Sequence, residues 1–147
     1  MEKLYKIKTP NEFTVLIEDI LAWYENSGQT NLIITLTGDL GAGKTAFTKK
    51  LGEYLGVEAV IVSPTFNIMK QYELTNKNFD LLVHIDAYRF EDLSESRPLK
   101  LAELITQPRT VFCIEWPEIL TELIPKKAVN LKITAGPDEI REVVVSY

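Results

Sequence analysis

The stretch from Gly38 to Thr45 constrains this chain more than any other, because it reads Gly-Asp-Leu-Gly-Ala-Gly-Lys-Thr and fits the pattern G-x-x-x-x-G-K-[ST]. Its glycines allow the backbone to curl so that consecutive N–H groups point at phosphate oxygens. An apolar run typical of a buried strand, residues 32–37, comes before the pattern, and apolar residues at helical spacing follow it. Because this is the context of a phosphate-binding P-loop, we predict a nucleoside triphosphate site rather than a glycine-rich turn that binds nothing.

The residues of the P-loop have separate expected roles. Lys44 should reach the β- and γ-phosphates, and the hydroxyl of Thr45 should bind Mg²⁺. The helix that begins near Lys44 adds the positive end of its dipole to the same place. Asp39 and Leu40 occupy variable positions, to which the pattern assigns no chemistry of their own. The nucleotide is expected to lie against Gly38, Asp39, Leu40, Gly41, Ala42, Gly43, Lys44, Thr45 and Ala46.

Length and composition limit the class of protein. At 147 residues the chain fits a single domain, 1–147, and its 46% hydrophobic and 25% charged residues are typical of a globular protein. The net charge of −5 argues against a large nucleic-acid-binding face, so a partner protein should hold most of any RNA. The lone cysteine, Cys113, lies in an apolar run and is expected to be a buried small hydrophobe. A chain without an internal disulfide suits the cytoplasm, and no apolar run approaches the length that spans a membrane.

Hydrophobic periodicity predicts an α/β fold. We expect an edge strand at residues 4–8 and an amphipathic helix that starts at Thr9-Pro10 with a capping box and ends near Glu25. Further strands are predicted at residues 32–37, 57–62, 67–74, 79–85, 110–114, 128–134 and 140–147, a surface loop at 91–98, and short helices at 99–105 and 117–123. The last two strands should form a hairpin at a sheet edge. The whole should be a P-loop NTPase-like three-layer fold: a central, mainly parallel sheet with antiparallel hairpin strands at its edges and helices on both faces.

Hydrolysis of a bound triphosphate also needs an acid for Mg²⁺ and a group that places the attacking water. Asp86 follows the apolar run at 81–85, and Glu115 follows the run at 111–114. Both carboxylates are expected at the carboxyl ends of strands, where ligands bind to open α/β sheets. We predict that they serve the metal and the nucleophile together with Thr45, one holding Mg²⁺ and the other orienting water. The alternative is that either is an exposed acid at a strand end.

Three further side chains are candidates for the site. Thr65 lies between the P-loop helix and the next hairpin, the place where GTPase-like P-loop proteins carry a threonine that senses the γ-phosphate. We count it as a candidate catalytic residue, the alternative being a hydroxyl satisfied within a turn that Pro64 starts. His84, the single histidine, should share a face with Asp86, either as buried hydrogen-bonded support or as a general base. Trp116 either packs or stacks.

Two sequence features that the chain lacks narrow the choice of nucleotide and of reaction class. Guanine-specific P-loop proteins normally carry Asn-Lys-x-Asp, whereas residues 76–79 read Asn-Lys-Asn-Phe, so GTP is disfavoured. A small-molecule kinase, the second class considered, would need a lid with several arginines and an acceptor pocket. The chain has only 4 arginines and a short loop for a lid. ATP or ADP with Mg²⁺ are therefore the expected cofactors.

Four segments taken together resemble the TsaE (YjeE) family. They are the P-loop at 38–45, Ser-Pro-Thr-Phe at 63–66, His-Ile-Asp-Ala-Tyr-Arg at 84–89 and Ile-Glu-Trp-Pro-Glu at 114–118. Their order and spacing agree with the family pattern, and the resemblance covers nearly the whole chain. The chain departs from the family at Ala87, where leucine is frequent, and over residues 94–108, so no partner contact is inferred there.

The resemblance implies a partner-dependent ATPase that takes part in making threonylcarbamoyladenosine, a modification of the adenosine next to the anticodon of tRNA. In that family the protein binds the TsaB–TsaD complex, meets tRNA only through it, and supports multiple turnovers by hydrolysing ATP. The resemblance assigns metal or catalytic roles to Asp86 and Glu115, places Thr65 near the γ-phosphate and puts Trp116 on the functional surface. The alternative is a nucleotide-dependent regulatory or scaffold subunit whose hydrolysis is incidental.

Overall fold

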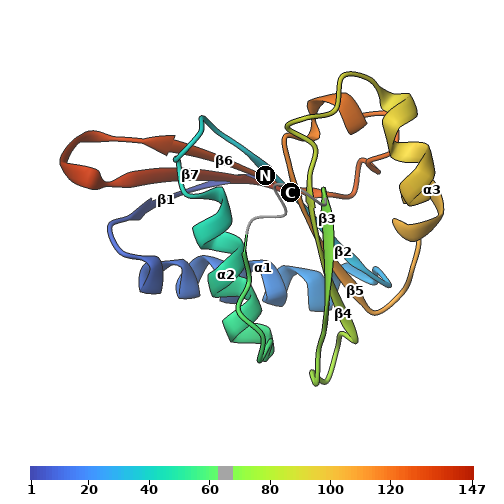
Figure 1. The fold of residues 1–147 in the computed structure, drawn as a ribbon. Coiled ribbons are helices and arrows are strands. Elements are labelled where there is room, and N and C mark those ends of the chain that lie inside the picture. Colours follow the sequence, from blue (N-terminus) through green and yellow to red (C-terminus); the bar gives the residue numbers. More distant parts are fainter. Residues whose placement is uncertain (63–67) are drawn as a thin grey trace.

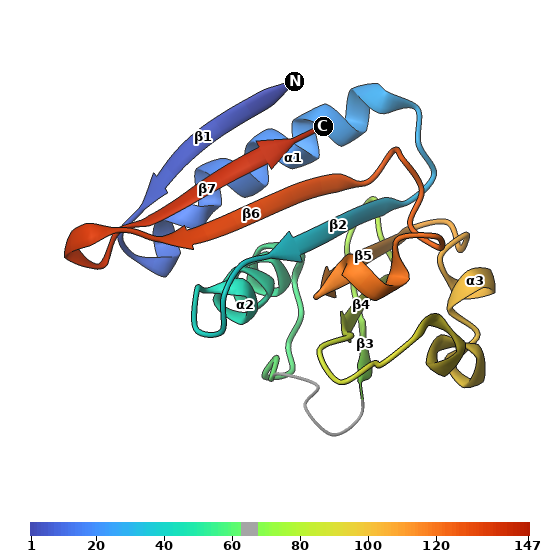
Figure 2. The same cartoon turned by 90° about the horizontal axis from the view of Figure 1, so that it is seen from above.

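One mixed β-sheet organises the part of the chain that the computed structural model describes, residues 1–62 and 68–147 (Figures 1 and 2). Its strands are β1 (Glu2–Ile7), β2 (Leu32–Thr37), β3 (Met69–Glu73), β4 (Leu81–Asp86), β5 (Thr110–Glu115), β6 (Val129–Ala135) and β7 (Arg141–Ser146). The α-helices are α1 (Phe13–Ser27), α2 (Lys44–Leu55) and α3 (Leu101–Leu104). Short 3-10 helices are η1 (Pro10–Glu12), η2 (Leu93–Leu99), η3 (Pro117–Leu120) and η4 (Pro137–Glu139).

The strands lie in the order β1-β7-β6-β2-β5-β4-β3. The four at the centre, β6, β2, β5 and β4, pair in parallel, whereas β7, β1 and β3 join antiparallel on the outside. This confirms the predicted α/β fold with a mainly parallel centre. The predicted N-terminal edge strand is confirmed as β1. Contrary to the prediction, the last hairpin is not itself at the edge, because β1 pairs with the outer side of β7.

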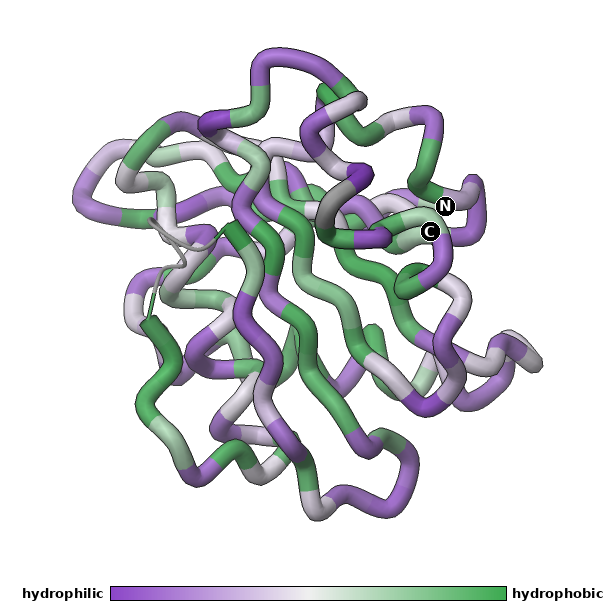
Figure 3. The backbone as a smooth tube through the Cα atoms, turned by 45° about the vertical axis from the view of Figure 1, so that its right-hand side comes forward, coloured by the Kyte–Doolittle hydropathy of each residue, from purple (hydrophilic) through white to green (hydrophobic). Residues whose placement is uncertain are grey.

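Helices cover both faces of the sheet, but unequally. α1 and α2 lie next to each other on one face, and α3 with the neighbouring 3-10 turns lies on the other (Figures 1 and 2). All six residues of β5 are buried, as expected for a strand covered on both sides, whereas burial alternates along β6. Hydrophobic segments accordingly concentrate in the central strands (Figure 3). Within the described ranges no helix is both long and apolar enough to cross a bilayer.

The first helical segment starts at Pro10, as predicted, with the 3-10 turn η1, and α1 continues past the predicted end near Glu25 to Ser27. The carboxylate of Glu12 accepts hydrogen bonds from the backbone N–H groups of Lys8 and Thr9, which steadies the entry through η1 into α1. The helix ends at Ser27 and is followed by Gly28, whose φ of 73° is a left-handed conformation that glycine adopts without strain. Cys113 is fully buried, as predicted, and burial raises the pKa of its thiol to about 12.

Two segments differ from the prediction. Residues 57–62 are apolar enough for a strand but form none, because Ile61 packs onto Gly52 of α2 instead of joining the sheet. Residues 91–98 are not simply a surface loop: the 3-10 helix η2 runs through them and buries Ser96, and Lys100, with φ 54°, separates it from α3. In both places tertiary packing overrides the local pattern.

Two glycines should respond oppositely to alanine. At Gly38, where φ is 149°, an added Cβ would overlap the backbone oxygen of Ile133, which cannot move away, so Gly38→Ala should cost about 2–4 kcal/mol of stability. At Gly52 the Cβ would overlap only the end of the flexible Ile61 side chain, which can move aside. The better helix propensity of alanine offsets the cost of that movement. We expect Gly52→Ala to stay within about 1 kcal/mol of wild type. Urea unfolding measures both, and equal losses would contradict this account.

Candidate functional site

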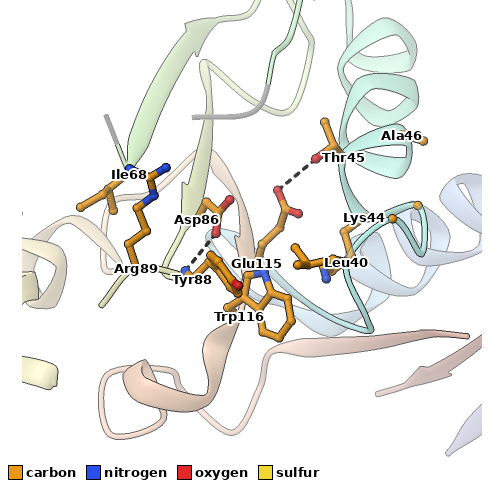
Figure 4. Close-up of a pocket in the computed structure, with 12 residues that line it drawn as sticks. Leu40, Lys44, Thr45, Ala46, Ile68, Asp86, Tyr88, Arg89, Glu115 and Trp116 are labelled. Carbon is orange, nitrogen blue, oxygen red and sulfur yellow. Dashed lines mark hydrogen bonds between the residues drawn. The ribbon is translucent and has the colours of Figure 1, made fainter. Parts of the chain in front are cut away.

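The sheet order brings the predicted site residues together. β5 lies between β2 and β4 and is parallel to both, so the P-loop that follows β2 meets Glu115 at the end of β5 and Asp86 at the end of β4. They surround a cavity of about 370 Å³ (Figure 4). Its lining residues are Leu40, Gly41, Gly43, Lys44, Thr45, Ala46, Ile68, Asp86, Tyr88, Arg89, Glu115 and Trp116.

The P-loop has the curled backbone that its glycines predict. Gly41 and Gly43 have φ values of 78° and 117°, and the N–H of Ala42 donates to the carbonyl oxygen of Asp39 at 3.0 Å. Helix α2 begins directly after Gly43 and so directs its first N–H groups at the cavity. Three of the predicted contacts, Gly38, Asp39 and Ala42, do not line the cavity, and the side chain of Ala42 is buried in the core.

Lys44 is a buried cation. Its Nζ donates to the carbonyl oxygens of Gly38, at 2.5 Å, and Asp39, at 3.2 Å, and lies 4.0 Å from the centroid of the Trp116 ring. Burial lowers the pKa of Lys44, although the charge of Glu115 opposes this shift. The described residues offer Lys44 no salt bridge. An ammonium group held inward without an anionic partner suits a site that receives phosphate.

Glu115 is buried beside the P-loop and has two contacts to one oxygen. Its Oε2 lies 2.5 Å from Nε2 of His84 and 3.5 Å from the hydroxyl of Thr45 (Figure 4 draws the second). His84 is completely buried on β4, so the prediction of a buried, hydrogen-bonded histidine is confirmed. The ring faces Glu115, which makes it a support for that carboxylate.

Asp86 is the second carboxylate of the site and the direct register partner of Glu115 across β4 and β5. Its Oδ1 accepts the backbone N–H of Tyr88 at 3.0 Å. Burial raises the pKa of Asp86, and the negative charge of Glu115 raises it further, while the hydrogen bond from Tyr88 opposes the shift. Two neighbouring carboxylates beside the P-loop form an acidic site that attracts cations.

The donor set fits Mg²⁺ in the manner of a nucleotide site. No group of three His, Cys, Asp or Glu side chains within residues 1–62 and 68–147 is arranged to hold a metal. Mg²⁺ is ordinarily bound through one or two carboxylates, substrate phosphates and several waters, so it needs no such cage. Thr45, Glu115 and Asp86 supply one hydroxyl and two carboxylates on the same cavity.

The two remaining candidates from the sequence are Thr65 and Trp116. Thr65 lies outside the described residues. Trp116 lines the cavity with the strained φ of 55°, and the ring of Tyr88 lies 5.0 Å from its own. The sequence did not lead us to predict Tyr88 and Ile68 as residues that line the cavity. Tyr88 could have been predicted because it lies two residues after Asp86, whereas nothing in the neighbouring sequence indicates Ile68.

A second cavity, of about 380 Å³, adjoins the other side of the P-loop. It shares Gly41, Gly43 and Ala46 with the first, and its remaining wall comes from both ends of the chain: Ile7, Lys8, Thr9, Pro10, Phe13, Glu139 and Arg141. No sequence pattern predicts it, because segments more than a hundred residues apart meet here only through the pairing of β1 with β7.

The raised pKa of Asp86 leads to a prediction about pH. Asp86 keeps its proton to higher pH in the folded protein than in the unfolded chain. The bound proton therefore stabilises the folded protein below the ordinary pKa of 3.8, and this stabilisation is lost as the pH rises through the pKa of Asp86 in the folded protein. Without nucleotide, Asp86→Asn should therefore be more stable than wild type at pH 7, and the gap should close toward about pH 4. Asp80→Asn is the control of opposite sign, because Arg109 lowers the pKa of Asp80. Urea unfolding across this pH range would refute the idea if wild type were the more stable at pH 7.

Comparison with known proteins matches this arrangement to one family. The model of the family described as threonylcarbamoyl adenosine biosynthesis protein TsaE matches residues 5–143. This chain belongs to the TsaE family. TsaE of Bacillus subtilis is 38% identical over 142 residues, which cover 96% of this chain and 84% of the relative. TsaE of Streptomyces coelicolor is 36% identical over 119 residues, 78% of each chain.

The fold agrees with the same assignment. A crystal structure of Bacillus subtilis YdiB superposes with a TM-score of 0.73 at 27% identity, covering 99% of this chain and 84% of that one. The TsaE relatives carry a name that places them in tRNA threonylcarbamoyladenosine biosynthesis. Both the family expected from the four sequence segments and the predicted fold class are thus confirmed.

Proposed function

We propose that this protein binds and hydrolyses ATP in support of threonylcarbamoyladenosine biosynthesis. One observation carries the proposal: four groups meet at one cavity beside the N-terminus of α2. They are the buried ammonium of Lys44, which has no salt bridge among the described residues, the hydroxyl of Thr45, and the strand-end carboxylates of Glu115 and Asp86. Cation, hydroxyl and acids are the groups that triphosphate binding and hydrolysis require of a P-loop protein. The family membership supports the pathway.

In this proposal each side chain has one task. Lys44 turns from the carbonyl oxygens of Gly38 and Asp39 to the β- and γ-phosphates, and the loop N–H groups hold the same oxygens. Thr45 and one carboxylate hold Mg²⁺, which neutralises charge on the phosphates, while the other carboxylate orients the attacking water. Glu115 is the more buried of the two and is the one beside Thr45.

The second cavity is a suitable place for the adenosine end of the nucleotide. It adjoins the first through Gly41, Gly43 and Ala46, on the side of the P-loop away from the carboxylates. A triphosphate with its terminal phosphate near Glu115 would lead its nucleoside toward Arg141 and Pro10. Arg141→Ala should then weaken binding of ATP but not of inorganic triphosphate, as calorimetry would reveal; equal losses for both ligands would place the nucleoside elsewhere.

We further propose that hydrolysis serves a complex of TsaB and TsaD homologues that transfers the threonylcarbamoyl group to the adenosine next to the anticodon. The chain has a net charge of −5, so tRNA would be held mainly by these partners. This protein would then act between rounds of transfer, and its ATPase activity would depend on the partners.

Turnover with the partners tests this role. TsaB, TsaD, threonylcarbamoyl-adenylate and tRNA are combined with wild type or with Glu115→Ala, and modified tRNA is counted over time. Wild type should support many rounds, whereas the variant should stall after about one. If the variant binds ATP, fails to hydrolyse it and still supports full multiple turnover, the protein is a nucleotide-dependent scaffold and its hydrolysis is incidental.

A further inference from the structure

The contact between His84 and Glu115 is the closest polar contact to either carboxylate of the site among the described residues. Nε2 of His84 lies 2.5 Å from Oε2 of Glu115, whereas the hydroxyl of Thr45 is 3.5 Å from the same oxygen, at the outer limit of a hydrogen bond. The histidine, and not the threonine, is therefore what holds Glu115. The long contact leaves the hydroxyl of Thr45 available to a metal ion.

The contact with Glu115 assigns the donor role to one ring nitrogen of His84. An ionised carboxylate only accepts hydrogen bonds, so a contact with the ionised form of Glu115 places the hydrogen on Nε2. The other ring nitrogen, Nδ1, has no hydrogen-bond partner among the described residues, although the ring is completely buried. The single polar contact of this buried ring is thus directed at Glu115, and the protein tolerates an unsatisfied Nδ1 to keep it.

Because of this contact, the two carboxylate oxygens of Glu115 have different surroundings. Oε2 is taken by His84, while Oε1 has no partner among the described residues and belongs to a side chain that lines the cavity. The two oxygens of Asp86 differ in the same way: Oδ1 accepts a hydrogen bond from the backbone N–H of Tyr88, and Oδ2 has no partner among the described residues. Each carboxylate is anchored by one oxygen and keeps the other for a ligand.

We propose that His84 is a positioning residue: its Nε2–H fixes the carboxylate of Glu115 so that the free oxygen meets Mg²⁺ beside Thr45. This inference rests on the proposed nucleotide function and adds to it the group that orients the buried acid. Hydrogen bonds to metal-binding carboxylates orient them, and their loss typically weakens metal affinity by about 10–100-fold. A purely structural histidine would fill the same space without affecting the metal.

Two amide substitutions separate these roles. The side-chain nitrogen of His84→Gln can occupy the place of Nε2 and donate to Glu115, whereas that of His84→Asn corresponds to Nδ1 and cannot reach it. Each protein is saturated with ADP, and Mn²⁺ binding is followed by electron paramagnetic resonance. We expect His84→Gln to stay within about 3-fold of wild type and His84→Asn to raise the Mn²⁺ dissociation constant by about 10–100-fold. ADP affinity without metal should be unchanged in both, which also verifies that the variants are folded.

Glu115→Gln distinguishes failure of the inference from failure of the proposed function. It should weaken Mn²⁺ binding, and in its presence His84→Asn should have no further effect, because the two residues act as one unit. If Glu115→Gln weakens Mn²⁺ binding but both His84 variants bind like wild type, the positioning role is overturned and the nucleotide function stands. If wild type binds no ADP, or its ADP complex binds no Mn²⁺, both are overturned.

Discussion

Lys44→Met should weaken ATP binding by at least about 100-fold, because removing one partner of a desolvated charge pair costs several kcal/mol. Lys44 is the buried cation at the cavity, and its Nζ is bound to carbonyl oxygens that it can exchange for phosphate oxygens. Methionine keeps an unbranched apolar side chain of similar length, so the variant mainly tests the loss of charge. Calorimetric titration with MgATP measures the effect.

The matched control is Lys49→Met, on the same helix. Lys49 is exposed and does not line the cavity that holds Lys44, so its removal should change ATP affinity by less than about 2-fold. The two variants lose the same charge, and only position separates them. An unchanged ATP affinity in Lys44→Met, or an equal loss of ATP affinity in Lys49→Met, would contradict the assignment of a P-loop.

Lys44→Met should leave the stability of the nucleotide-free protein within about 3 kcal/mol of wild type. Burial lowers the pKa of Lys44, so the folded protein holds this cation less favourably than the unfolded chain does. The loss of the hydrogen bonds from its charged Nζ to Gly38 and Asp39, about 1.5–3 kcal/mol each, opposes the gain from removing a buried charge. Urea unfolding without nucleotide would contradict this reasoning if the variant were several kcal/mol less stable.

Glu115→Gln should slow ATP hydrolysis by about 10²–10⁴-fold, the range expected when a group that places the metal or activates water is neutralised. ATP binding should be largely kept, since the phosphates are held by the loop N–H groups and Lys44. The amide preserves size and can still meet His84, so the fold should survive. Phosphate release, measured with the partner proteins present, reports hydrolysis, and calorimetry reports binding.

Glu118→Gln is the control for charge alone. Glu118 is exposed, lies three residues further on and influences Lys44 only through its charge. Its replacement should leave hydrolysis within about 2-fold of wild type. If Glu118→Gln slowed hydrolysis as much as Glu115→Gln, the effect would be one of net charge, and no specific role for Glu115 would follow. Asp86→Asn in the same assay would show which acid matters more for turnover.

Much of the fold follows from local patterns. The bounds of β2 agree with its predicted residues 32–37, and the P-loop and the following helix lie where the motif places them, because glycine spacing and helical periodicity act within a few residues. The same local reasoning fails at residues 57–62 and at η2. There the choice between strand, turn and coil depends on whether a distant element offers a pairing edge or a packing surface, as Gly52 does for Ile61.

The sequence by itself determined the glycine-rich loop, the two acids at strand ends and the α/β class, since each depends on residue type and on neighbours close along the chain. Only the tertiary structure decided which groups touch. His84 meets Glu115 across 31 residues and Thr45 approaches it across 70, through the order in which parallel strands pair. Such contacts depend on side-chain packing between separate elements, which no local pattern encodes. The P-loop marks where phosphate is expected, and the strand order places the acids beside it.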